Sequence, residues 1–97
     1  MSDNNKFLTQ NSKSPSMGTQ KLYSFPNGYG ASVVSHSGSY GGDKGLWEIL
    51  ITHEDNPVYD TPIASDVIGH LNWKEVNNYL NQISNLDVRN ANEKIEL

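Results

Sequence analysis

Cysteine is absent from this 97-residue chain, which excludes disulfide bonds, thiolate catalysis and cysteine-ligated zinc. Long apolar runs are absent too, since no stretch approaches the ~20 residues that cross a bilayer, and no charged-then-apolar leader for secretion is present. Apolar residues make up only 35% of the sequence, a low share for a globular chain. The absence of a spanning apolar run and of a leader predicts a soluble intracellular protein that does not contact a membrane, whereas the absence of cysteine does not identify the compartment.

The two ends of the chain account for the low apolar share. Residues 1–20 hold only Phe7, Leu8 and two Met among polar side chains, too little apolar surface to offset the entropy lost on ordering, so we expect a disordered N-terminal arm. Residues 87–97 read as a polar C-terminal tail. Residues 21–86 then form a single domain, and a domain of this size buries only about 60% of the surface of its unfolded chain. Pairing with itself or with a partner would stabilise it.

Positive charge is missing from the middle of the chain. The net charge of −4 argues against direct binding of duplex nucleic acid, which requires a basic surface. Residues 45–73 contain no Lys or Arg, and five acids lie among them: Glu48, Glu54, Asp55, Asp60 and Asp66. These acids fit either a solvated loop that maintains solubility or a patch that steers binding toward a basic surface on another protein.

Three short apolar runs predict an antiparallel sheet. Residues 21–25 favour a strand, and Pro26-Asn27-Gly28 follows as a turn that reverses the chain. Residues 31–36 form the second strand, residues 37–45 a glycine-rich connection, and residues 46–53 the third strand. Trp47, Ile49 and Ile51 alternate onto one face of this third strand. The pattern predicts a three-stranded meander.

A C-terminal helix is the next expected element. Residues 54–65 read as a long loop with apolar anchors, and residues 66–71 as one short helical turn. Asn72 followed by Glu75 resembles a capping box. An apolar stripe at spacings of three and four follows, formed by Trp73, Val76, Tyr79, Leu80, Ile83 and Leu86. Packing this stripe on Trp47, Ile49 and Ile51 gives a two-layer α+β fold in which Trp47 and Trp73 belong to the core.

Three strings of the sequence are distinctive as a set: YSFPNGYGASVVSHSGSYG, GLWEILI and VYDTPIASDVIGHLNWKEVNNYL. Together they resemble a family of small, mostly uncharacterised proteins encoded by tailed bacteriophages. The resemblance implies a protein of the host cytoplasm that binds a host protein and inhibits or redirects it. It brings no enzymatic activity and no cofactor with it.

The residues themselves carry no catalytic or metal-binding pattern. His36, His53 and His70 show no HxH or HExxH spacing, although His53-Glu54-Asp55 places possible ligands side by side. No G-x-S-x-G motif frames a serine, and the glycines at 38–45 do not form a phosphate-binding P-loop. We therefore expect neither an enzyme nor a metal protein.

Tyrosines in the predicted turns and loops are the main functional candidates. Tyrosine is favoured at interfaces because it brings much contact area with few rotatable bonds. The expected partner-binding set is Tyr29, Tyr40, Asp55, Tyr59 and Asp60.

Two other functions stay open. One is binding of a small ligand such as a nucleotide in a pocket between subunits, lined by Ser35, His36, Ser39, Tyr40 and Tyr59. The other is a minor structural or assembly component of the virion. The exposed edges and second face of a thin sheet also predict a homodimer.

Overall fold

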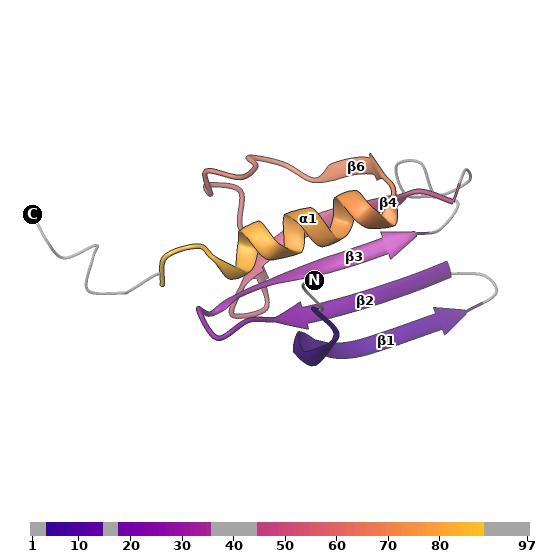
Figure 1. Ribbon diagram of the computed structural model, residues 1–97, viewed down its shortest axis with the longest axis horizontal. Coiled ribbons are helices and arrows are strands. Elements are labelled where there is room, and N and C mark those ends of the chain that lie inside the picture. The colour runs from indigo at the N-terminus through magenta and orange to yellow at the C-terminus, as the bar shows by residue number, and fades with distance from the viewer. Residues whose placement is uncertain (1–3, 15–17, 36–44, 89–97) are drawn as a thin grey trace, which may run out of the picture.

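In the described residues, an antiparallel sheet packs against one α-helix (Figure 1). The computed structural model describes residues 4–14, 18–35 and 45–88. Along the chain it contains η1 (Asn4–Phe7), β1 (Leu8–Ser14), β2 (Gly18–Ser24), β3 (Tyr29–Ser35), β4 (Trp47–His53), β5 (Asn56–Pro57), β6 (Ile68–Leu71) and α1 (Trp73–Ser84). The strand order is β1-β2-β3-β4-β5, and β6 also pairs with β4. The expected α+β fold is confirmed, but the expectation of three strands is wrong because the sheet has six.

The first additional strand lies in the segment expected to be a disordered arm. β1 pairs with β2 from Leu8↔Tyr23 to Ser14↔Gly18, with one irregularity between Leu8 and Gln10. Phe7 anchors its start, because the Phe7 ring meets the Phe25 ring edge-on at a centroid distance of 5.1 Å. The expected arm is therefore wrong for residues 4–14. Residues 89–97 of the expected tail and residues 37–44 of the expected glycine-rich connection lie outside the described residues.

The second unexpected strand replaces a predicted helical turn. β6 pairs with β4 through Ile68↔Ile49 and Leu71↔Trp47, so Gly69 and His70 lie opposite the single residue between them on β4. Two residues against one define a β-bulge. His70 accommodates it with a φ of +60°, a backbone region that few side chains other than Asn, Asp and His adopt.

The turn between β2 and β3 forms where the sequence predicts it. The Gly28 amide donates to the Phe25 carbonyl at 3.0 Å, and the Phe25 amide donates to the Tyr29 carbonyl at 2.8 Å. Gly28 has a φ of +89°, the left-handed conformation that closes a three-residue hairpin loop. The buried Asn27 side chain joins this loop to the end of α1, because its Nδ2 donates to the Ile83 and Leu86 carbonyls at 2.9 Å each.

Helix α1 begins at the predicted cap. The Asn72 side chain accepts from the Glu75 amide at 2.8 Å, and the Glu75 side chain accepts from the Asn72 amide at 2.9 Å. This reciprocal capping box satisfies backbone donors that the first turn leaves without intrahelical partners. The helix then lays Val76, Leu80 and Ile83 against the sheet, and each of these side chains is fully buried.

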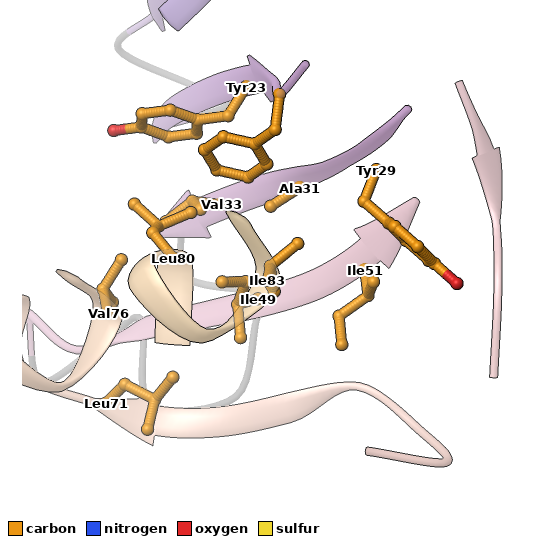
Figure 2. Packing of buried hydrophobic residues seen from close by; sticks show 11 residues of the cluster. Tyr23, Tyr29, Ala31, Val33, Ile49, Ile51, Leu71, Val76, Leu80 and Ile83 are labelled. Carbon is orange, nitrogen blue, oxygen red and sulfur yellow. The ribbon is translucent and has the colours of Figure 1, made fainter. Parts of the chain in front are cut away.

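The core lies between α1 and the side chains of β3 and β4 that face it (Figure 2). Cross-strand pairs Val33↔Ile49 and Ala31↔Ile51 supply the sheet side of this layer. The cluster consists of Tyr23, Phe25, Tyr29, Ala31, Val33, Ile49, Ile51, Leu71, Val76, Leu80 and Ile83. The predicted contact between the Trp47, Ile49, Ile51 face and the helix stripe is confirmed. α1 packs mainly on β3, β4 and β6, so β1 and much of β2 lie beside it (Figure 1).

Candidate functional site

A strained turn projects two acids beyond the end of β4. His53 pairs with Asn56, so Glu54 and Asp55 are the two central residues of the hairpin that joins β4 to β5. Their φ angles are +49° and +70°. A tight hairpin of type I′ needs this backbone at both positions and normally uses Asn-Gly there. Both acidic side chains are exposed.

Backbone hydrogen bonds hold this turn in place. The Glu54 amide donates to the Gly28 carbonyl at 3.0 Å, which ties the turn to the β2–β3 hairpin. The Asn56 side chain donates to the Glu54 carbonyl at 3.1 Å. The acids are therefore displayed by a fixed backbone.

The chain after β5 is fixed on both sides of Tyr59. The Val58 amide donates to the Ile51 carbonyl at 3.0 Å. Further on, Thr61 is buried, and its Oγ1 donates to the Ala64 carbonyl at 3.1 Å and accepts from the Ala64 amide at 3.2 Å. Between these anchors Tyr59 and Asp60 lie on the surface, with Tyr59 50% exposed. We call residues 54–60 the acidic loop.

Three residues of the expected partner-binding set share this loop: Asp55, Tyr59 and Asp60. Tyr29 does not belong with them, since it is only 5% exposed and is part of the core. Tyr29 lies in β3 and not in the turn, and its register partner is His53. The two rings meet edge-on at 4.9 Å between centroids. Tyr29 is therefore a core residue and does not belong to the exposed surface of the acidic loop. Tyr40 lies outside the described residues.

The two described residues of the expected ligand pocket between subunits, Ser35 and Tyr59, lie apart within one chain. Ser35 ends β3, and its Oγ donates to the Leu46 carbonyl at 2.9 Å. Tyr59 follows Val58, whose amide bonds to the Ile51 carbonyl, and Ile51 lies five residues after Leu46 in the chain. At about 3.3 Å per strand residue, that separation is roughly 16 Å. His36 and Ser39 lie outside the described residues.

Three observations on metal ligands, buried polar atoms and membrane spans concern the part of the chain that the structure describes. No group of three or more His, Asp or Glu side chains there could hold a metal ion. Every buried side-chain nitrogen and oxygen in that part has a hydrogen-bond partner. None of its helices is long and apolar enough to span a membrane.

An exposed tryptophan is the feature that sequence reasoning missed. Trp73 was expected in the core but is 38% exposed. Its ring packs against the half-buried Trp47 ring at 5.0 Å between centroids, and the Lys21 Nζ lies 5.7 Å from its centroid. Trp73 is the first residue of α1, directly after the cap. This position is the sequence signal that could have indicated that the apolar stripe begins where the sheet no longer covers it fully.

Searches of protein-family models, curated proteins and solved structures found nothing that matches this chain.

Proposed function

We propose that this protein is a non-enzymatic binding module that docks the acidic loop on a basic surface of another protein. The observation that carries the proposal is the exposure of Tyr59 between two anchored positions, Val58 and Thr61. A loop that is already ordered loses little conformational entropy when it binds.

The composition of the loop supports this role. Tyrosine is among the residues that dominate binding energy at interfaces, because its ring buries a large area at low entropic cost. Glu54, Asp55 and Asp60 add exposed negative charge to the same loop. Such charge raises the rate of encounter with a basic surface and disfavours acidic partners. The loop therefore combines an apolar anchor with a charged rim.

The resemblance to tailed-phage proteins suggests where the partner is found. On this proposal the partner is a host protein of the bacterial cytoplasm, which the module inhibits or redirects. The lack of a nucleophile motif or metal-ligand spacing in the sequence supports binding over catalysis.

The test is affinity capture from lysates of candidate bacterial hosts, with recovered proteins identified by mass spectrometry. The wild-type protein is compared with Tyr59→Ala and with the charge-reversed loop variant Glu54→Lys/Asp55→Lys. Asp87→Lys is the matched control, because it reverses the charge of an exposed acid outside the acidic loop.

A true partner is expected with the wild type and the control and lost with the loop variants. For the purified pair, Tyr59→Ala should weaken binding by about 2 kcal/mol, roughly thirtyfold. Recovery of the same proteins at the same levels by the wild type and both loop variants would refute the proposal.

A further inference from the structure

Charge of opposite sign is separated across this small molecule. Described residues 4–35 contain Lys6, Lys13 and Lys21 and no acid, whereas residues 45–88 contain seven acids and one Lys. β1 and β2 form one end of the strand order, and β5 forms the other. The β1–β2 end of the sheet is therefore basic, although the whole chain carries a net charge of −4.

Two of these lysines lie on the neighbouring strands β1 and β2, beside α1. Asn11 pairs with Lys21 and Lys13 pairs with Thr19, so the two lysines are diagonal neighbours on one face, with about 7–8 Å between Cα atoms. The register partner of Lys21 on β3 is Val33, which is fully buried in the core. Both lysine side chains therefore lie on the face of the sheet on which α1 packs.

Trp73 borders these lysines. The Lys21 Nζ lies over the Trp73 ring, and 38% of Trp73 remains exposed. Lys13 is itself exposed on β1. We call Lys13, Lys21 and Trp73 the lysine strip. It presents positive charge beside an aromatic surface, which is the complement of the acidic loop.

We propose that the acidic loop of a second copy of this chain docks on the lysine strip. The inference rests on the proposed function of the loop and names one of its partners. Opposite charges on the two surfaces bring the copies together, and Tyr59 adds an aromatic side chain that fits against the exposed edge of Trp73.

Reciprocal docking closes the assembly. Each copy carries both surfaces, so a two-fold axis lets each loop contact the strip of the other copy, and the result is a dimer. A partner with a more basic surface than the lysine strip competes for the same loop. In the dimer, the acidic loop is therefore covered by the second copy until such a partner displaces that copy.

The experiment measures the oligomeric state of the full chain by sedimentation at about 0.05 M and about 0.5 M salt. Charge contacts at a surface are strongly screened at the higher concentration, where the Debye length falls well below 10 Å. We expect a dimer at low salt that dissociates at high salt. A monomer at low salt and high protein concentration would overturn the inference.

Charge exchange locates the contact. Lys13→Glu/Lys21→Glu and Glu54→Lys/Asp55→Lys should each raise the dimer dissociation constant at least about tenfold, since each places like charges opposite one another. The quadruple variant exchanges both signs and should restore the dimer, while Asp87→Lys should leave it unchanged. A dimer that is insensitive to either double variant, or a quadruple variant that stays monomeric while folded by circular dichroism, would refute the inference.

The lysine variant separates this inference from the proposed function. Lys13→Glu/Lys21→Glu keeps the acidic loop intact, so it should lose the dimer and still capture a basic partner. If the wild type dimerises through both surfaces, but neither it nor the monomeric Lys13→Glu/Lys21→Glu variant captures a protein through the acidic loop, the host-partner proposal alone is refuted.

Discussion

Asn27 shows how one side chain fixes the relation between two elements. Its amide group donates to the Ile83 and Leu86 carbonyls at the end of α1, and its Oδ1 accepts from the Tyr29 amide at 3.0 Å. The carbonyls at the end of a helix lack intrahelical donors and need partners. The turn that reverses the sheet therefore also closes the helix.

Asn27→Asp is expected to destabilise the protein strongly. The carboxylate keeps the acceptor for Tyr29 but loses both donated hydrogen bonds, and it places negative charge at the negative end of the helix dipole. We expect the free energy of unfolding to fall by about 2–4 kcal/mol, measured by urea denaturation at pH 7. Asn78→Asp makes the same chemical change at an exposed site of α1 and should cost under about 0.5 kcal/mol. Equal losses for the two variants would contradict this assignment.

At the scale of elements, the η1–β1 segment owes its order to packing and not to its own composition. Phe7 packs on Phe25, Leu8 lies against the core, and the rest of β1 is a polar strand held by pairing with β2.

Phe7→Ala therefore tests whether this segment contributes to stability. It should lower the free energy of unfolding by about 1–2 kcal/mol, because it removes an aromatic pair and partly buried apolar area. Gln10→Ala, an exposed change in the same strand, is the control and should have little effect. Indistinguishable denaturation curves for wild type and Phe7→Ala would restore the picture of a disordered arm.

The elements that the sequence predicts correctly are those with a local signal. The Pro26-Asn27-Gly28 turn, the alternation in β4 and the Asn72 cap each depend on residues close together in the chain. β1 lacks such a signal, because its polar run becomes a strand only through β2. In β6, the spacing of Ile68 and Leu71 suits a helical turn. The bulge at His70 allows both residues to pair with β4 and to lie on the same face of the sheet.

The candidate site divides in the same way. Tyr59 is exposed, as its position between two prolines and several acids predicts. Tyr29 follows a glycine turn and looks similar in sequence, but the register of β3 with β4 places it against His53 in the core. Trp73 starts an apolar stripe, yet it lies at the end of α1 where the sheet no longer covers it fully. Register and element ends are tertiary properties, and local pattern does not specify them.

At the scale of the whole molecule, the first and last described elements are joined. The Asn4 side chain is buried, and its amide donates to the Asn77 and Asn81 side chains of α1 at 3.4 and 3.2 Å. η1 and α1 are thus linked across more than seventy residues of sequence. We expect the described part of the chain to unfold as one unit.

Two probes check this cooperativity. Tryptophan fluorescence reports on the Trp47–Trp73 pair, and far-ultraviolet circular dichroism reports on the sheet and α1 together. The two denaturation midpoints should coincide in the wild type and should shift downward together in Asn4→Ala, by about 1–3 kcal/mol in unfolding free energy. Midpoints that differ between the probes would show that the described part of the chain does not unfold as one unit.

The way in which β4 is flanked has a consequence for growth of the sheet from one molecule to the next. β3 borders one side of β4, while β5 and β6 divide the other side between them, so within the described chain the long open border is β1. If molecules joined into fibres by strand pairing, a new strand would add at the open edge of β1. The side chains of β1 are mostly hydroxyls and amides with little apolar surface, so stacking of β1 strands from different molecules would be only weakly stabilised. We therefore expect the protein to stay in solution at high concentration.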